Sequence, residues 1–309
     1  MNPKVSIVIV SMNKLSNLEI CLPSIRKFTK TPHKIYVVAY MFTPENLKAL
    51  HDNYPYVEII ESNEIRGFSE NNNLALKKVD TPLVFILNDD TEFKEPVLDK
   101  LVSSLEMTPE ATVMSPVIYN GDGKLLYSGR RKETFFSFVV RLLINYRKTN
   151  SKYENGKGIF RSYDLSGAAF LIYTEAFRQI GFFNEKYFFC PEDVEVGHLL
   201  NEKGQLCYVD ADCNIIHYEG VSSKKGKLFY ATTITAFLGN SYFYGNNLFR
   251  RNILLLMWKY KYLQHYISFV LRKTQHHKDY MYIYNEVYSC YKNKRVTKDV
   301  FIQEYKKVI

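Results

Sequence analysis

Three adjacent polar residues have the types and spacing of a cation site. Asn88, Asp89 and Asp90 follow directly on the apolar run at residues 82–87. Carboxylates at the end of a buried strand are costly unless a positive charge binds there. Hard divalent cations such as Mg²⁺ take carboxylate oxygens and share them with substrate phosphates. The sequence therefore predicts a cation site here, with a simple polar turn of exposed aspartates as the alternative.

A second acidic group begins a predicted helix. Glu192, Asp193 and Glu195 fall within the first residues of the segment at 191–204. Burial would raise the pKa of one such carboxyl group toward neutrality, and that group could then act as a general base. The alternative is that the charges only complement the helix dipole.

Two further features could bind ligands. His217 lies near the end of a strand-like segment, where neutral imidazole is a good ligand for Mn²⁺-like ions beside carboxylates. Ser69 is the predicted N-cap of a helix whose first turns carry Asn72 and Asn73, and helix-start amides suit an anionic or polar ligand. The alternatives are a structural histidine and a capped helix without a ligand.

Alternating strands and helices position these residues. The strands are predicted from unbroken apolar runs, at 5–10, 34–40, 57–62 and 82–88, and the helices from helical spacing, at 17–28, 44–54 and 69–79. Such short connections imply an α/β fold with a mostly parallel central sheet covered on both faces. Ligands of these sheets bind at the carboxyl ends of the strands. Those ends are Ser11–Asn13, Ala39–Tyr40, Ser62–Asn63 and Asn88–Asp90.

The rest of the chain is less regular and then helical. Residues 120–163 are loop-like, and residues 164–173 are predicted as one strand. The segment at 174–183 is predicted as a helix that Gly181 terminates. Strands follow at 205–210 and 214–218, and the pattern is helical after residue 223. We expect two domains, residues 1–223 and a helical region at 224–309.

Charge is distributed unevenly over the 309 residues, whose formal net charge is +9. Residues 224–309 contain 16 Lys and Arg against 4 Asp and Glu, a net charge of +12, which predicts an anionic partner surface. In that region, residues 253–273 have a polar face, and their wide apolar face must pack on the body, on another subunit or into a bilayer interface. The polar positions are Lys261, Gln264, His265, Ser268 and Arg272.

Composition excludes several classes of protein. Apolar residues make up 46% of the chain, which is typical of a globular protein and not of a disordered one. No apolar run reaches the roughly 20 residues that a membrane-spanning helix needs, and we expect no signal peptide. The five scattered cysteines contain no CxxC pair, which favours reduced thiols in a cytosolic protein over a disulfide framework or a zinc site.

Taken in order, these motifs resemble those of the family 2 glycosyltransferases, which have the GT-A (Rossmann-like) fold, and within them the bacterial rhamnosyltransferase-like branch. The segments that carry the resemblance are residues 5–25, 63–76, 83–93, 164–204 and 215–223. They span about 70% of the chain. The resemblance implies an inverting transferase that uses a nucleotide-diphosphate sugar, a UDP- or dTDP-sugar, with a divalent cation, Mg²⁺ or Mn²⁺.

The resemblance also assigns roles to residues. It implies that Asp193 is the catalytic base and that Asp90 and His217 are metal ligands. It places Glu192 and Glu195 where they would orient the base or contact the acceptor. The remaining implied donor-site residues are Ser11, Asn13, Tyr40, Arg66, Asn72, Asn88, Asp89 and Gly167.

Two positions depart from the family pattern. Met12 stands where the family has an aromatic residue that stacks on the base, and Ala39 stands where it has an aspartate that binds the base. Tyr40 could replace the lost stacking. A degenerate, non-catalytic binding protein is therefore one alternative function. A metal-dependent nucleotidyltransferase is another, disfavoured because residues 11–20 contain no glycine-rich phosphate loop.

The expected partners follow from the same resemblance and from the basic C-terminal region. The acceptor would be a glycan or a lipid-diphosphate-linked sugar of surface polysaccharide synthesis. The enzyme would work in the cytoplasm, at the inner face of the plasma membrane, with peripheral membrane contact through its basic, aromatic C-terminal region. A homo-oligomer is possible. Nucleic acid is not an expected partner, because the body carries a slightly negative charge.

Overall fold

The computed structural model describes residues 2–126, 128–144, 157–218 and 227–307. The chain divides into two compact units. Unit 1 comprises residues 1–132, 150–184 and 192–220, and unit 2 comprises residues 133–149, 185–191 and 221–309. Unit 2 thus includes two segments that precede the domain boundary predicted at residue 223, a position that itself lies outside the described residues.

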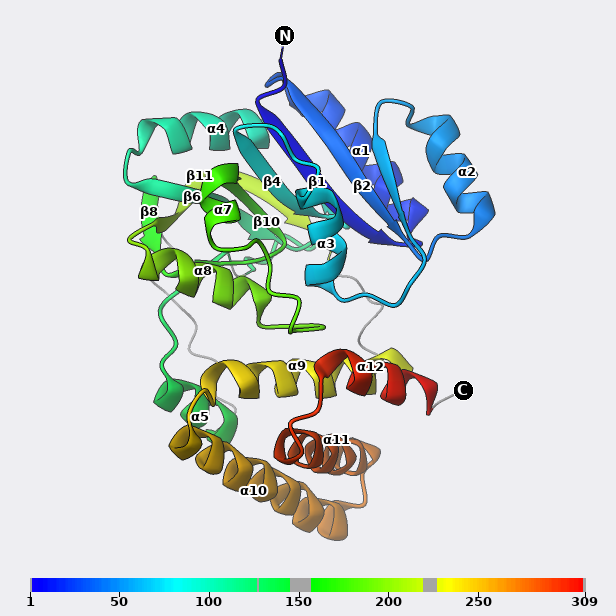
Figure 1. Cartoon of the computed structure of the whole chain (residues 1–309), viewed down its shortest axis with the longest axis vertical. Coiled ribbons are helices and arrows are strands. Elements are labelled where there is room, and N and C mark those ends of the chain that lie inside the picture. Colours follow the sequence, from blue (N-terminus) through cyan, green and yellow to red (C-terminus); the bar gives the residue numbers. More distant parts are fainter. Residues whose placement is uncertain (1, 127, 145–156, 219–226, 308–309) are drawn as a thin grey trace. The chain divides into compact units, whose positions relative to one another are not determined.

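Unit 1 is built on one large sheet (Figure 1). Within the described residues its strand order is β3 (Glu58–Ser62), β2 (His33–Tyr40), β1 (Val5–Met12), β4 (Leu83–Asn88), β10 (Ala169–Tyr173), β6 (Ala111–Tyr119), β11 (Leu206–His217) and β5 (Thr91–Glu92), with β8 (Ile159–Ser162) also paired to β11. The strands β1 to β4 are mutually parallel, whereas β10 runs antiparallel to both β4 and β6. The prediction of a mostly parallel sheet is confirmed.

The register brings the predicted ligand-binding ends together at one edge. Ser11 is opposite Ala39, Tyr40 is opposite Ser62, and Val10 is opposite Asn88. The central strands β1 and β4 contain no charged residue, because both faces of the sheet are covered there, whereas the edge strand β3 carries Glu58 and Glu61.

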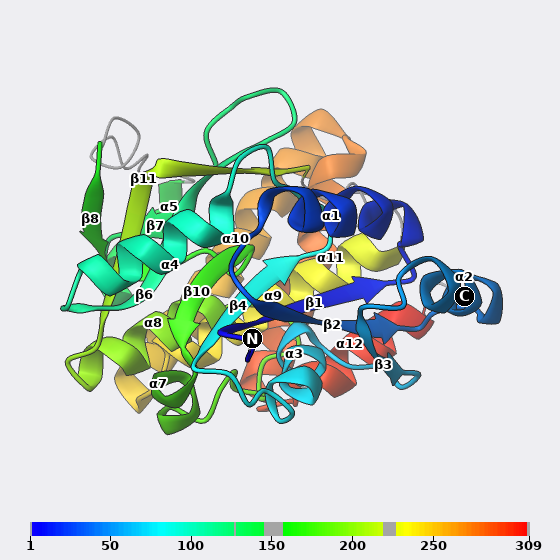
Figure 2. The same cartoon turned by 90° about the horizontal axis from the view of Figure 1, so that it is seen from above.

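Helices cover both faces of the sheet, and Figure 2 shows α1 and α3 on opposite sides of β1 and β2. On one face lie α1 (Leu15–Phe28), α2 (Pro44–Asn53) and α4 (Val97–Met107); on the other lie α3 (Phe68–Leu76), α7 (Thr174–Gln179) and α8 (Glu192–Glu202). Alternate residues of β1 enter the two cores: Ile7 and Ile9 pack toward α1, and Val8 packs toward α3. The α/β class is therefore confirmed.

Four local predictions were wrong. The strands predicted at 205–210 and 214–218 are one strand, β11, whose register with β6 shifts between Asp210 and Asn214. Ser69 is not an N-cap; α3 is capped at Gly67, whose N–H donates to Glu70 Oε2 at 3.0 Å, and Ser69 is buried inside the first turn. The segment at 164–173 is two strands, β9 (Asp164–Leu165) and β10, because each pairs with a different partner, β7 (Gly129–Arg130) and β4. The described part of 120–163 is not only loop, since it contains β7, α5 (Phe135–Ile144) and β8.

Unit 2 is helical. Its described elements are α5, α9 (Lys227–Tyr244), α10 (Leu248–Arg272), α11 (Gln275–Lys292) and α12 (Thr297–Lys306). The helix α10 packs on α11 and α5, and α9 packs on α11 and α12. Trp258 is fully buried at the centre, and its indole N–H donates to Ser241 Oγ at 3.0 Å. No helix in the described part of the chain is both long and apolar enough to cross a bilayer.

The orientation of α10 is unusual. Its inward face includes Leu254, Trp258 and the polar residue Lys261, which is only 4% exposed. Much of its apolar face is exposed instead, for example Leu256 at 68% and Leu263 at 52%. The polar side chains that define one face in the sequence therefore do not define the solvent-facing side.

Candidate active site

The two predicted metal ligands meet where β5 pairs with β11. His217 is opposite Thr91 in this antiparallel pair, and the N–H of Tyr218 donates to the carbonyl of Asp90 at 2.8 Å. The pairing places His217 Nε2 at 2.9 Å from Asp90 Oδ1, and Asn88 Nδ2 lies 3.3 Å from the same nitrogen. The Asp90 and His217 side chains are only 13% and 16% exposed.

This pair fits a divalent cation. Neighbouring ligands of an octahedral ion are about 2.9 Å apart when the metal–ligand bonds are 2.0–2.1 Å long. The distance between Asp90 Oδ1 and His217 Nε2 is 2.9 Å. One carboxylate and one imidazole is also a donor set that Mn²⁺-like ions accept.

Asp89 adds a second carboxyl group beside the pair. Burial raises the pKa of Asp89 to about 6, and the charge of Asp90 acts in the same direction, against the opposing hydrogen bonds from Ser11 and Asn17. Two carboxyl groups that are largely shielded from solvent create a site where a positive charge is favoured. Asn17, from the first turn of α1, was not identified from the sequence.

The predicted base, Asp193, is held by an arginine that the sequence analysis missed. Arg130 Nη2 donates to Asp193 Oδ2 at 2.6 Å, and Arg130 Nε donates to the buried Asp164 at 2.6 Å. The N–H of Gly167 also approaches Asp193 Oδ2, at 3.4 Å. Burial alone would lower the pKa of Arg130, but the charges of Asp193 and Asp164 raise it above its ordinary value, so the guanidinium stays charged. The carboxylate of Asp193 is thus fixed in orientation and is still 19% exposed.

Close backbone packing holds this group in place. A Cβ on Gly197 of α8 would lie 2.4 Å from Asp164 Cβ and 2.7 Å from its Cα, so only glycine allows α8 to approach β9 this closely. Hydrogen bonds of its own backbone groups hold Arg130 on β7, since its N–H donates to Ser162 Oγ and its carbonyl accepts from the N–H of Tyr163.

A short chain of contacts joins the two halves of the site. Gly167, which touches Asp193, precedes Ala168, whose carbonyl accepts a hydrogen bond from the N–H of Asn88 at 2.9 Å. The Asn88 side chain in turn lies beside His217. The carboxyl end of β4 and the start of β10 therefore carry both the predicted metal ligands and the support of the predicted base.

Other predicted donor-site residues cluster at the ends of β2 and β3. The hydroxyl of Tyr40 accepts from the N–H of Arg66 at 3.3 Å, and Arg66 Nη1 donates to Ser62 Oγ at 3.2 Å. Ser62 donates to Asn71 Oδ1 at 2.7 Å. Tyr40 is only 8% exposed, so little of its ring is available for stacking, whereas Met12 is 45% exposed.

The remaining predicted site residues differ in their hydrogen bonds and in their burial. Asn13 Oδ1 accepts from the N–H of Thr43 and from Asn46, which ties the end of β1 to the start of α2. Asn72 donates to the carbonyl of Phe68 in its own helix. Glu192 is buried at 7% exposure, and Glu195 is half-buried. The structure alone assigns none of these residues a role toward a ligand.

Comparison with known proteins identifies the family to which the chain belongs. The chain matches the profile of "Glycosyl transferase family 2" over residues 6–181, more than half of its 309 residues. The chain belongs to this family. The resemblance inferred from the motifs is confirmed. The match contains Asp90 and Arg130, whereas Asp193 and His217 lie beyond it.

Curated relatives of this glycosyltransferase are distant. It is 23% identical over 235 residues to the N-acetylglucosaminyl-diphospho-decaprenol L-rhamnosyltransferase of Mycobacterium tuberculosis, which covers 70% of this chain and 76% of that protein. It is 24% identical over 227 residues to the O-antigen biosynthesis protein RfbC of Myxococcus xanthus, covering 72% of this chain but 18% of that protein.

Solved structures confirm the GT-A fold. GalNAc-T7 with UDP, GalNAc and Mn²⁺ aligns with a TM-score of 0.55 at 19% identity, covering 70% of this chain and 44% of that one. The mannosyltransferase PcManGT from Pyrobaculum calidifontis, in complex with GDP-Man and Mn²⁺, aligns with a TM-score of 0.51 at 12% identity, covering 95% and 88%. At these identities the likeness concerns the fold.

Proposed function

We propose that this glycosyltransferase is an inverting, cation-dependent enzyme that moves a sugar from a nucleotide-diphosphate sugar to an acceptor hydroxyl. One observation carries the proposal. The Asp90–His217 pair and the Arg130–Asp193 pair are both held at the adjoining ends of β4 and β10. One pair suits a cation and the other presents an oriented carboxylate, and a cation-dependent displacement with inversion uses these two parts.

Each residue then has one task. Asp193 accepts the proton of the acceptor hydroxyl as that oxygen attacks the anomeric carbon, and the diphosphate leaves from the opposite side. Arg130 holds Asp193 in place through its 2.6 Å contact. Asp90 and His217 would hold the divalent cation, which would neutralise charge on the diphosphate. Glu192 and Glu195, on the same helix turn as Asp193, would orient the base or contact the acceptor.

The substrates are proposed from the relatives. The donor is a UDP- or dTDP-sugar, and the acceptor is a glycan or a lipid-diphosphate-linked sugar of surface polysaccharide synthesis, in line with the names of the curated relatives. The exposed Met12 would contact the base in place of an aromatic ring. Family membership favours this reaction over the nucleotidyltransferase alternative.

The decisive test is nucleotide binding with and without Mn²⁺. We expect UDP or dTDP to raise the melting temperature only with the cation, by a few degrees, because ligand at 100 times its Kd stabilises by about 2.7 kcal/mol. Asp90→Asn should remove the Mn²⁺-dependent part of the shift. Asp193→Asn should keep the shift but lose transfer, while the surface control Asp52→Asn keeps both. Turnover by Asp193→Asn at the wild-type rate would refute the assignment of the base.

We further propose that unit 2 contacts an anionic membrane surface through the exposed face of α10. Large apolar or aromatic side chains recur there every three or four residues from Leu256 on, at Leu256, Tyr260, Leu263, Ile267 and Val270, each at least 48% exposed. Phe249, two turns before Leu256, is 67% exposed. The α5 helix, which packs on α10, also exposes Phe136 and Ile144. The net charge of +12 over residues 224–309 complements anionic lipid, to which each Lys or Arg near the surface adds about 1 kcal/mol.

Vesicle binding tests this surface. The full chain should sediment with phosphatidylglycerol–phosphatidylcholine vesicles and not with pure phosphatidylcholine, and added salt should weaken binding. Leu263→Glu with Ile267→Glu should abolish binding, while Ile20→Glu, an exposed apolar position of unit 1, should not. A stable dimer that the double variant dissociates, without vesicle binding, would show instead that a second copy covers this face.

A further inference from the structure

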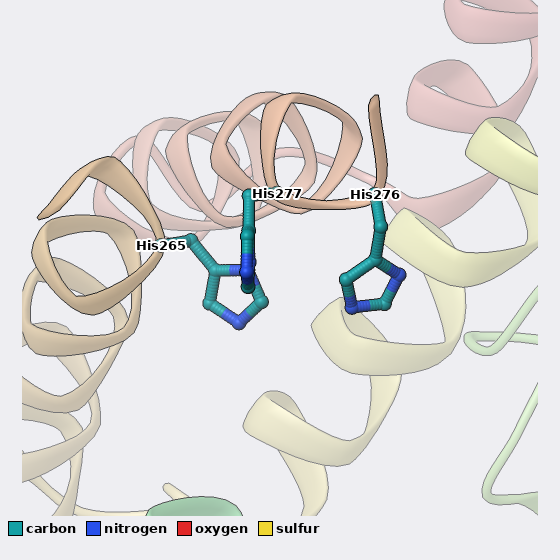
Figure 3. A group of neighbouring side chains, drawn as sticks. All are labelled: His265, His276 and His277. Atoms are coloured by element: carbon teal, nitrogen blue, oxygen red, sulfur yellow. The ribbon is translucent and has the colours of Figure 1, made fainter. Parts of the chain in front are cut away.

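Three histidines gather at the turn between α10 and α11, in unit 2. His265 lies two turns before the end of α10, and His276 and His277 open α11 (Figure 3). Their rings point to the same side in Figure 3. No catalytic or donor-site role proposed above uses them.

Two of their nitrogen atoms are spaced as metal ligands are, and the third ring lies close by. His265 Nδ1 and His277 Nδ1 are 3.3 Å apart, and one nitrogen from each of the three rings lies within 4.8 Å of the others. Ligands of a tetrahedral zinc ion with bonds of 2.0–2.1 Å are about 3.3 Å from one another. We propose that His265, His276 and His277 form a second metal site, which binds a Zn²⁺-like divalent transition-metal ion.

The chemistry of the cluster favours this class of ion. Three imidazoles and no carboxylate suit Zn²⁺, Ni²⁺ or Cu²⁺ rather than Mg²⁺ or Mn²⁺. Metal binding needs neutral imidazole, and burial, aided by the nearby charges of Lys261, His277 and His276, lowers the pKa of His265 to about 4. The charge of Lys261 works against a bound cation, but its ammonium group is turned to Gln264 Oε1 at 2.9 Å.

The fourth coordination position would be filled by water. In the described residues, no Cys, Asp or Glu joins the three histidines as a ligand. His276 is exposed, whereas His265 and His277 are half-buried, so solvent reaches the cluster from the His276 side. Three protein ligands with an open fourth position is a known arrangement for zinc.

The ion would fasten a helical hairpin at its turn. Only Lys273 and Thr274 separate α10 from α11; Lys273 is left-handed, with φ of 50°, and Thr274 Oγ1 accepts from the N–H of His277. The cluster links α10 to the first turn of α11 directly. Binding therefore stabilises the packing of these two helices and should slow the opening of the turn.

Metal titration of the tag-free, chelator-treated full chain tests the proposal. One equivalent of Co²⁺ should bind with the visible absorption of a tetrahedral site, Zn²⁺ should displace it, and millimolar Mg²⁺ should not. Zn²⁺ should raise the melting temperature by a few degrees. His265→Gln and the exposed His276→Gln should each weaken Co²⁺ binding at least about tenfold. The second variant keeps the test valid if the first does not fold.

Two controls separate this site from the proposed catalytic one. His51→Gln, at an exposed histidine of α2, and Asp90→Asn should both keep the tetrahedral Co²⁺ spectrum. His276→Gln should keep any Mn²⁺-dependent transfer activity. The proposal is overturned if His276→Gln and His265→Gln bind Co²⁺ as the wild type does, or if the wild type gives no tetrahedral spectrum. Neither outcome depends on whether the chain is an active transferase.

Discussion

Replacing Arg130 by methionine should reduce stability and activity through two separate contacts. The guanidinium joins Asp164, whose side chain is 2% exposed, to Asp193, whose side chain is 19% exposed, both at 2.6 Å. Arg130→Met leaves the Asp164 carboxylate buried without its cation, and removing one partner of a buried pair costs about 3–5 kcal/mol. For a unit of this size that corresponds to a fall in melting temperature of roughly 6–20 °C.

The loss of activity has a different origin. Without Arg130, Asp193 loses a charge-assisted hydrogen bond worth about 1.5–3 kcal/mol. If all of that energy serves to orient the base, kcat should fall roughly 10- to 150-fold. The donor Kd should change little, because Arg130 contacts neither Asp90 nor His217 in the described structure.

A double variant separates the two effects. Arg130→Met with Asp164→Asn removes both buried charges, so thermal unfolding should return close to the wild-type temperature. Asp193 remains without its arginine, so kcat, measured by release of the nucleoside diphosphate, should stay low. Arg178→Met, which removes a surface pair with Glu175, is the matched control. A double variant with wild-type kcat would refute the idea that Arg130 positions Asp193.

Three other substitutions test the supporting structure. Gly197→Ala should lower both melting temperature and kcat, because its Cβ would lie 2.4 Å from Asp164 Cβ and overpacking typically costs about 1–3 kcal/mol; wild-type behaviour would contradict the close approach. Gly167→Ala, whose Cβ would be 3.5 Å from its nearest neighbour, should keep the wild-type melting temperature. Thr297→Val removes the hydroxyl that accepts from Phe188 N–H, so thermal unfolding should show a loss of about 1–3 kcal/mol that Thr297→Ser does not share.

Local sequence signals were sufficient to predict the central strands of the sheet. The strands β1 and β4 are short apolar runs without charged residues, β2 has only Lys34 near its start, and both faces of such strands must be covered. Their parallel order then fixes which residues share an edge, so the convergence of Ser11, Tyr40 and Asn88 could be predicted. The sequence also singled out Asp90 and His217, although their contact depends on the long-range pairing of β5 with β11.

Arg130 could not be found in the same way. It lies in a run of charged residues that is typical of a loop, and its strand, β7, is only two residues long. The signal that identifies it is the buried Asp164 opposite, which needs a cation, but that burial is a property of the folded chain. The burial of Lys261 on α10 was missed for a related reason, because Lys261 is accommodated by its bond to Gln264 and by the Tyr284 ring, 5.8 Å away.

The arrangement around Arg130 is easier to explain by function than by stability. A buried ion pair stabilises a fold little compared with apolar side chains of similar volume, since desolvation offsets most of the attraction. An apolar cluster, however, could not hold a carboxylate that must stay partly exposed. Arg130 ties Asp193, which is still reachable by solvent, to Asp164, which is not. The buried aspartate anchors the arginine, and the arginine orients Asp193, so the ion pairs fix the position of the one carboxylate that we propose as the base.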